Sequence, residues 1–175
     1  MPPLEPVPQK FILHWGEMGT RWGVNRTVAQ VHALLYLSPR PLDAEEIAKT
    51  LGVARSNVST SLRELQACGI VRVVHVQGDR RDHFEAGKDV WEMFRTILEE
   101  RKRREVDPTL RVLRECVAEL EKGGALDTST RERIQAMLDF LMTMSTLYEE
   151  VRRMPPGTIR SLAKLRGRLR KLVGK

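Results

Sequence analysis

The sequence has few of the residues from which metal and redox sites are built. It holds two cysteines, Cys68 and Cys116, and four histidines among 175 residues. The cysteines do not form a CxxC pair, and no two histidines have the spacing of an HExxH motif. We therefore expect reduced, half-buried thiols, with no metal and no cofactor. A redox-sensing thiolate is disfavoured as well, because no basic cluster adjoins Cys68.

Catalytic motifs and long apolar runs are missing too. The GxSxG turn of serine hydrolases is absent, and the segment GEMGTRWG (residues 16–23) lacks the Lys-Ser or Lys-Thr of a phosphate-binding loop. We therefore do not expect an enzyme. Because no signal peptide or apolar stretch of membrane-spanning length is visible, we expect the chain in the cytoplasm. Its content of 41% hydrophobic residues is enough for a folded core.

The net charge of +7 is unevenly distributed. Nine of the 30 Lys and Arg residues lie from Arg152 onward, where there is no acid, and the rest of the chain holds 21 basic against 23 acidic residues. Any DNA affinity of the central region must therefore come from the local placement of arginines rather than from bulk charge. The arginines that could supply it are Arg55, Arg63, Arg72, Arg80 and Arg81.

Residues 43–87 have the pattern of a helix, a tight turn, a second helix and a β-hairpin. Asp43 and Glu46 have the spacing of a capping box, and Leu42 can pack against Ile47. Gly52 suits a left-handed helix end, so only a short turn separates the two helices. The order predicts a mainly α protein: a winged helix-turn-helix with a small β-hairpin wing and helical dimerisation extensions.

The second of these helices has one apolar face and one small polar face. Val58, Leu62 and Leu65 fall on one side at 100° per residue. The opposite side carries mostly small polar residues, Ser56, Ser59 and Thr60, together with Arg63. Small side chains let the helix approach the DNA major groove, and Ser, Thr and Arg can contact base edges and phosphates. An ordinary solvated face is the alternative, which the flanking helix and hairpin disfavour. The predicted DNA contacts on this helix are Arg55, Ser56, Asn57, Ser59, Thr60 and Arg63.

The hairpin gives an independent indication. Residues 70–76 are rich in β-branched side chains, Gly78-Asp79 is a turn signal, and residues 83–85 can return as the second strand. Its tip displays Arg80 and Arg81, which can enter a minor groove or hold the phosphates at its rim. A nearby acid such as Asp79 can hold the Arg81 guanidinium in one orientation. The alternative is a turn that serves only solubility.

Taken together, the segments from residue 23 to residue 110 resemble the GbsR branch of the MarR-type winged-helix transcriptional regulators. They are LLYLSPRPLDAEEIAKTLGV, RSNVSTSLRELQACGIV, GDRRDHFEAGKDVWEMF and REVDPTL. The wing GDRRD leading into DVWEMF is the most specific part. The resemblance implies base or phosphate contacts from the helix residues named above and from Arg80 and Arg81. Ala54 departs from the pattern, which commonly has a Ser or Thr cap there, and this helix start is expected to be less stable by ~1 kcal/mol.

The resemblance also implies control by a small-molecule effector. In some members of the branch this is a choline-like quaternary ammonium compound, which aromatic faces hold through cation–π attraction. Trp91 and Phe94 are effector-binding candidates by composition alone, as are Trp15, Trp22 and Tyr36. A role in the core is the favoured interpretation for each of them.

The rest of the chain is expected to be helical with clear breaks. We divide the sequence into an N-terminal arm and short helix (1–24), the winged helix-turn-helix with its following helix (25–105), and a helical dimerisation region with a basic C-terminal helix (106–175). The opening MPPLEPVP predicts an extended arm before a helix over residues 11–21, whose glycines limit its regularity. A helix over residues 88–104 is expected to stop sharply at Val106-Asp107, with Asp107 as the cap of the next helix and Pro108 in its first turn.

A seam of three- and four-residue steps over residues 134–151 indicates coiled-coil packing. Packing within one chain is the alternative, but dimerisation is favoured because a two-fold pair can bridge half-sites ~34 Å apart. The predicted dimer contacts are Met137, Leu141, Met144 and Tyr148. The basic tail repeats the apolar pattern, and it can pack in the dimer, contact DNA phosphates or, less simply, lie on an anionic membrane.

These features predict a cytoplasmic homodimer that binds a double-stranded DNA operator and acts as a repressor by occluding a promoter, under the control of an effector. The alternative is a nucleoid or interaction protein that binds DNA with little sequence preference through its basic tail. Deletion of residues 156–175 separates the two hypotheses. The regulator retains its base preference, whereas the tail-driven protein loses nearly all affinity.

Overall fold

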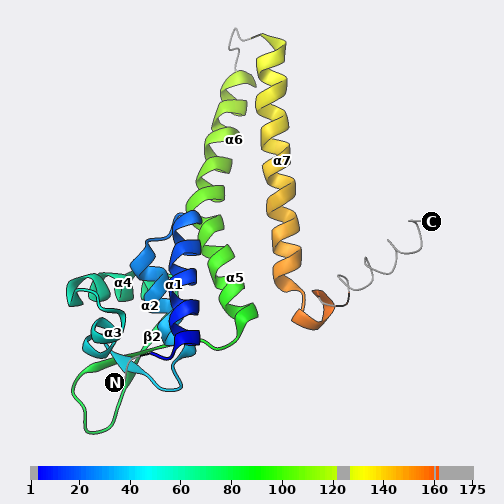
Figure 1. Ribbon diagram of the computed structural model, residues 1–175. Coiled ribbons are helices and arrows are strands. Elements are labelled where there is room, and N and C mark those ends of the chain that lie inside the picture. Colours follow the sequence, from blue (N-terminus) through cyan, green and yellow to red (C-terminus); the bar gives the residue numbers. More distant parts are fainter. Residues whose placement is uncertain (1–3, 122–126, 160, 162–175) are drawn as a thin grey trace. The chain divides into compact units, whose positions relative to one another are not determined.

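The structure is a computed structural model that describes residues 4–121, 127–159 and 161 (Figure 1). It divides into two compact units, the first ending at Ile97 and the second beginning at Leu98. The first unit contains α1 (Pro6–Arg21), α2 (Arg26–Leu37), β1 (Leu42–Asp43), α3 (Ala44–Leu51), α4 (Arg55–Ala67), β2 (Val71–His75), β3 (Asp82–Ala86) and most of α5 (Val90–Arg101). The second contains the end of α5, the π-helical η1 (Lys102–Val106), α6 (Asp107–Glu121) and α7 (Thr128–Arg153).

The helix-turn-helix formed by α3 and α4 has the boundaries expected from the sequence. The capping box at the start of α3 is complete, because the Asp43 side chain accepts from the backbone of Glu46 and the Glu46 side chain accepts from the backbone of Asp43. Gly52 ends α3 in the left-handed region, at φ 65°. Ala54 precedes α4 without a side-chain cap, as its methyl group dictates. The short connection therefore follows directly from local chemistry.

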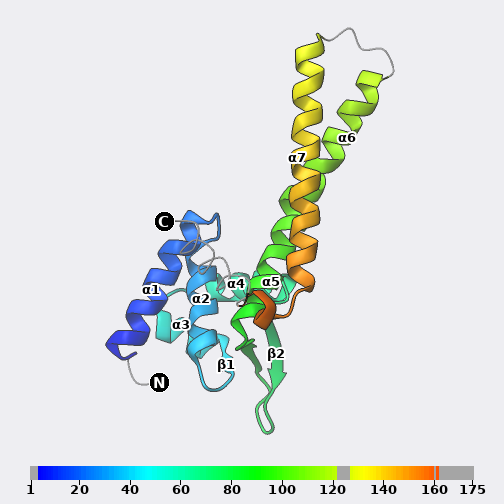
Figure 2. The same cartoon turned by 90° about the vertical axis from the view of Figure 1, so that its right-hand side faces the viewer.

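The wing is confirmed as an antiparallel hairpin, and it gains a third strand that the sequence did not reveal. Five residue pairs join β2 to β3, from Val71 opposite Ala86 to His75 opposite Asp82. β1 adds to the other edge of β3, so the strand order is β1-β3-β2. Figure 2 shows the hairpin loop projecting beyond the sheet. Since β1 has two residues, it is too short to give an alternating pattern, but it ties the wing to the start of α3.

The core of the first unit is centred on α2. Val31, Leu34 and Leu35 of this helix are at most 2% exposed, and they belong to one apolar cluster with Leu42, Ile47 and Val58. Asn25 caps α2 by accepting from the backbone of Thr27. The buried face of α4 is part of this cluster. Its opposite face is therefore fixed towards solvent.

The N-terminal segment differs from its prediction in two respects. The last three residues of the expected extended arm, 6–8, are helical, because α1 already begins at Pro6, and proline is tolerated in the first turn of a helix, where its missing N–H has no partner to lose. The glycines of α1 allow close packing against α2 and do not make the helix irregular. Gly16 and Gly19 are buried, and a Cβ atom at Gly19 would lie 2.5 Å from the Cβ of Ala29 on α2.

In the second unit the predicted break at Val106-Asp107 is wrong. The helical path continues from α5 through η1 into α6, and Asp107 has helical φ and ψ of −64° and −41°. The Asp107 carboxylate does not cap α6 but accepts from the Lys102 ammonium group at 2.9 Å. Pro108 cannot continue the regular bonding pattern, since it lacks an N–H, and a π turn before it accommodates the irregularity without ending the helix.

α6 and α7 lie side by side in both ribbon views (Figures 1 and 2) and contact each other. The buried apolar residues of this pair are Leu110 and Leu120 of α6 and Leu138 of α7. Asp127 caps α7 by accepting from the backbone of Thr130 at 2.7 Å. Most of the segment expected to form a basic C-terminal helix, residues 160 and 162–175, lies outside the described residues.

Candidate nucleic-acid interface

The polar face of α4 is presented to solvent as the sequence predicts. Val58, Leu62 and Leu65 are at most 4% exposed, which orients the helix. Of the six predicted DNA-contacting residues, Ser59 is half-buried and the other five are exposed: Arg55, Ser56, Asn57, Thr60 and Arg63. The structure therefore brings all six together on one accessible helix.

The two arginines of α4 differ in their surroundings. Arg63 lies along its own helix, where Nη2 donates to the Thr60 hydroxyl at 3.3 Å and Nε to the Ser59 carbonyl at 3.4 Å. Arg55 lies 3.7 Å from the Glu45 carboxylate in an exposed ion pair. Exposed pairs of this kind contribute little stability, so both guanidinium groups are available for an external anion.

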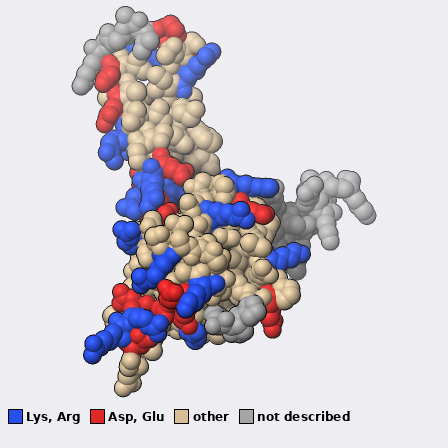
Figure 3. All heavy atoms as spheres, turned by 60° about the vertical axis from the view of Figure 1, so that its left-hand side comes forward, with Lys and Arg blue, Asp and Glu red and all other residues tan. Residues whose placement is uncertain are grey.

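A groove of about 380 Å³ separates α4 from the sheet. Its walls carry charges of both signs, with Arg55, Arg63 and Arg81 among the basic residues and Glu45 and Asp82 among the acidic ones. Figure 3 shows the same mixture on the surface, where blue and red side chains alternate around the lower part of the first unit. This surface is not a uniformly basic patch, which agrees with the nearly balanced charge of the central sequence.

The structure separates the two predicted wing arginines. Arg80 is exposed, and no hydrogen bond or ion pair holds it within the described residues. Arg81 is held by two carboxylates: its Nε donates to Asp79 at 3.0 Å, and its Nη1 lies 2.6 Å from Oδ2 of Asp43. The hydrogen bonds from Arg81 hold the pKa of Asp79 well below its usual range. A third arginine, Arg72, donates to Glu85 across the hairpin at 2.6 Å.

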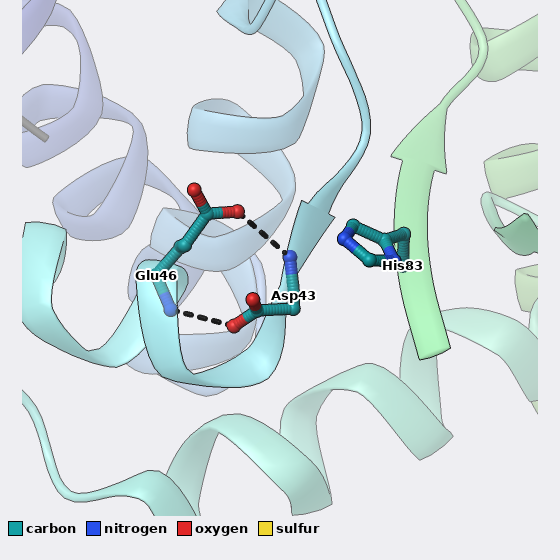
Figure 4. Close-up of side chains that lie close together, drawn as sticks. All are labelled: Asp43, Glu46 and His83. Carbon is teal, nitrogen blue, oxygen red and sulfur yellow. Dashed lines mark hydrogen bonds between the residues drawn. The ribbon is translucent and has the colours of Figure 1, made fainter. Parts of the chain in front are cut away.

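A buried polar cluster supports this side of the wing (Figure 4). Asp43, Glu46 and His83 come from β1, α3 and β3, and one potential ligand atom of each lies within 4.8 Å of the other two. The two carboxylates already have partners, because Asp43 caps α3 through Oδ1 and pairs with Arg81 through Oδ2, and Glu46 accepts from Arg40 and from the Asp43 backbone. We therefore assign the carboxylates to capping and ion pairing.

A lysine that sequence reasoning missed fixes the chain after the wing. The Lys88 ammonium group donates to the carbonyls of Leu35, Tyr36 and Ser38 at 2.7–2.8 Å, which are the free acceptors at the end of α2. Burial lowers the pKa of Lys88. Burial, together with the charge of Lys88, also lowers the pKa of His32 to about 4, so His32 is neutral at pH 7.

The aromatic effector candidates lie in three places. Trp15 stacks on Phe11 and meets the edge of Trp22, with centroid distances of 5.5 and 6.2 Å. Tyr36 lies beneath the Lys88 ammonium group, at 5.9 Å. Trp91, half-buried, and Phe94, 47% exposed, lie on successive turns of α5.

The four predicted dimer contacts follow one side of α7, within about 60° of one another at 100° per residue. Met137 and Met144 are exposed, whereas Leu141 and Tyr148, on the edge nearer the buried Leu138, are half-buried. Burial raises the pKa of the Tyr148 hydroxyl, and this hydroxyl lacks a hydrogen-bond partner among the described residues. The exposed stripe also contains Phe140 and Leu147, which sequence reasoning missed and which are 58% and 53% exposed.

Comparison with known proteins agrees with this geometry. The MarR family model matches residues 22–82. The HTH-type transcriptional repressor GbsR of Bacillus subtilis is 23% identical over 136 residues, covering 76% of this chain and 75% of that protein. YvaV of Bacillus subtilis, named as an HTH-type transcriptional regulator, is 25% identical over 95 residues. That match spans about half of each protein, 54% of this chain and 54% of YvaV.

One solved structure, described as a transcriptional regulator, has a TM-score of 0.66 with 21% identity. It covers 84% of this chain and 96% of the other, which shows a shared fold. Among the described helices, none combines the length and the apolar character needed to cross a membrane. The matched segment contains α2, β1, α3, α4 and the hairpin up to Asp82, so the winged helix-turn-helix is the part of the chain that is similar to the MarR family.

Proposed function

We propose that the protein is a sequence-specific regulator of transcription that binds double-stranded DNA as a homodimer. The observation that carries the proposal is the polar outer face of α4, which the buried residues Val58, Leu62 and Leu65 hold towards solvent in a winged helix similar to the MarR family. A helix with short polar side chains can enter the major groove deeply enough to reach base edges.

The residues divide into contacts that read bases and contacts that position the helix. Arg63 and Asn57 have the side chains best suited to bidentate contacts, with guanine and adenine respectively. Arg55 and Ser56 lie in the first turn of α4, where Ala54 provides no side-chain acceptor, so this end of the helix suits a phosphate. Arg80 extends the positive charge to the wing.

Dimerisation uses the exposed stripe of α7 in this proposal. Met137, Phe140, Met144 and Leu147 follow one another at intervals of three, four and three residues, as in a coiled-coil seam, and each is at least 44% exposed. A second copy of the chain provides a matching stripe, because a two-fold interface pairs identical surfaces. The two winged helices of the dimer then read two half-sites.

Repression and effector control complete the proposal. A dimer bound across a promoter excludes other proteins by steric occlusion, and the relative GbsR is named a repressor. Trp91 and Phe94 on α5 are the proposed contacts for an effector such as a quaternary ammonium compound. Quenching of tryptophan fluorescence by choline, lost in Trp91→Leu, tests this part separately.

Selection of bound sequences from a genomic fragment pool tests the function itself. We expect one two-fold symmetric motif, bound at least a hundredfold more tightly than its scrambled version at equal salt. The protein lacking residues 156–175 should keep this preference. If the full chain enriches no motif and the truncated chain loses nearly all DNA affinity, the tail-driven binding protein is the correct description.

A further inference from the structure

The wing depends on contacts outside its own two strands. A two-stranded hairpin is marginally stable in water, and β2 and β3 have five residues each. β1 pairs with β3 only at Leu42 and Asp43, opposite Phe84 and His83. The position of the wing relative to α4 is therefore sensitive to the side chains at this junction.

Asp43 uses its two carboxylate oxygens for different purposes. Oδ1 caps α3, accepting from the backbone of Glu45 at 2.8 Å and of Glu46 at 2.9 Å. Oδ2 is buried and has no hydrogen bond of regular geometry, but it lies 2.6 Å from Nη1 of Arg81. The Asp43 side chain is 4% exposed, and a buried carboxylate requires a compensating charge. Arg81 supplies that charge from the wing.

Arg81 is fixed from several sides at once. Its Nε and Nη2 donate to Asp79, its Nη1 meets Asp43, and its backbone N–H donates to Asp79 at 3.0 Å. Its carbonyl oxygen lies 3.0 Å from Nδ1 of the buried His83. All three guanidinium nitrogens thus face carboxylates. If Arg81 moved to a DNA phosphate, it would leave the buried Asp43 carboxylate without a partner, which disfavours the exchange.

Arg80 differs from Arg81 in having no carboxylate partner among the described residues. It is adjacent in sequence, it is exposed, and no ion pair or hydrogen bond holds it within the described residues. We propose that Asp43 and Arg81 form a wing anchor, in which Arg81 positions the hairpin against the start of α3, while Arg80 makes the phosphate contact. This assignment rests on the proposed DNA-binding function for its affinity readout, but the anchor itself is a property of the free protein.

The central variant is Asp43→Asn, which separates the two uses of this side chain. Asparagine is as good an N-cap as aspartate, so α3 keeps its start, but its amide cannot neutralise Arg81. We expect faster amide hydrogen exchange in β3 and the wing turn, and about tenfold weaker binding to the selected operator. Asp127→Asn, which alters another aspartate cap, in the second unit, should change neither quantity.

Salt dependence separates anchoring from phosphate contact. Arg80→Gln should lower the slope of log affinity against log salt by roughly one per wing, whereas Arg81→Gln should weaken binding with nearly the wild-type slope. In the Asp43→Asn background, Arg81→Gln should add little further loss, since both changes break the same contact. Should Asp43→Asn alter circular dichroism, Asp43→Ser provides a second uncharged cap for the same measurements.

The proposal is overturned if Arg81→Gln lowers the salt slope as much as Arg80→Gln, or if Asp43→Asn leaves hydrogen exchange in β3 unchanged. The first result would make Arg81 a direct DNA contact, and the second would show that the ion pair does not hold the wing. A wild-type protein without sequence preference would instead contradict the proposed function. The exchange measurement on the free protein would still decide whether the anchor exists.

Discussion

At the scale of single residues, Arg63 is the sharpest test of base reading. It lies exposed on α4, and its hydrogen bonds to Ser59 and Thr60 hold it along the polar face rather than against an acid. We expect Arg63→Ala to weaken operator binding by ~1–3 kcal/mol and to relax the preference at one position in each half-site. Fluorescence anisotropy with the operator and with duplexes changed at single positions measures both effects.

Lys10→Ala is the matched control, because it removes one exposed positive charge from α1 and leaves the helix-turn-helix unchanged in sequence. It should leave base preference unchanged. If Arg63→Ala lowers the affinity for operator and scrambled duplexes equally, Arg63 contacts only phosphate. If the affinity does not change, α4 does not dock in the major groove as proposed.

His32 links folding stability to pH. Burial and the nearby Lys88 lower its pKa from 6.5 to about 4 in the folded state. The unfolded chain therefore binds more protons between these values, and the stability contributed by neutral His32 is present above pH 6.5 and lost as the pH falls towards 4. Between pH 7 and pH 5 we expect the free energy of unfolding to fall by about 2 kcal/mol through this residue.

Urea denaturation at the two pH values measures this effect. His32→Leu removes the titrating group and also its Nε2, which lacks a hydrogen-bond partner among the described residues, so this variant should be less sensitive to pH than the wild type. His14→Gln, at an exposed position, should retain the full dependence. A wild-type dependence in His32→Leu would assign the effect to other groups.

At the scale of elements, α1 packs on α2 through its glycines. The three nearest neighbours of a Cβ atom at Gly16 belong to the flexible side chains of Gln30 and Arg26, whereas at Gly19 the Cβ of Ala29 lies 2.5 Å away and cannot move without the α2 backbone. We expect Gly19→Ala to destabilise the first unit by ~1–3 kcal/mol and Gly16→Ala to stay within ~1 kcal/mol of the wild type. Denaturant unfolding compares the two helical substitutions. If the two variants have equal free energies of unfolding, α1 and α2 can move apart at little cost.

The accuracy of sequence reasoning differed between local and long-range features. The capping box at Asp43 and the left-handed Gly52 are encoded within a few residues, and both were predicted correctly. The helical passage through Asp107 was missed, because the aspartate forms an ion pair with Lys102, and the π turn that accommodates Pro108 has no simple sequence signature. Elements with strong local signals are therefore predictable, whereas their continuity is not.

The candidate site shows the same division. The polar face of α4 follows from periodicity, and the pairing of Asp79 with Arg81 follows from their close spacing. The pairing of Arg81 with Asp43 joins residues 38 positions apart through a strand of two residues, and the Lys88 contacts join residues at least 50 positions apart. Periodicity could not show which members of the α7 seam pack inside their own unit.

At the scale of the whole molecule, the proposed dimer depends on the exposed stripe of α7. Phe140→Asp places a charge in the centre of this stripe, where burial against a second copy would remove its hydration without a partner. We expect a monomer with wild-type helix content and far weaker binding to the two-half-site operator, because the second half-site loses the effective concentration provided by the first. Light scattering and circular dichroism measure the two properties.

Leu141→Asp is the instructive comparison, since Leu141 is half-buried on the side of α7 that carries Leu138. This change should disturb the pairing of α6 with α7 and reduce helix content, whatever its effect on association. If Phe140→Asp remains a dimer with unchanged affinity, the stripe is not the interface.

The most direct test of the central claim is one titration of the wild-type protein with its selected duplex, a single half-site duplex and a scrambled duplex at the same salt. The account predicts two chains per full duplex, much weaker binding to the half-site, and at least a hundredfold weaker binding to the scrambled sequence. Equal affinity for the full and scrambled duplexes would contradict base reading by α4.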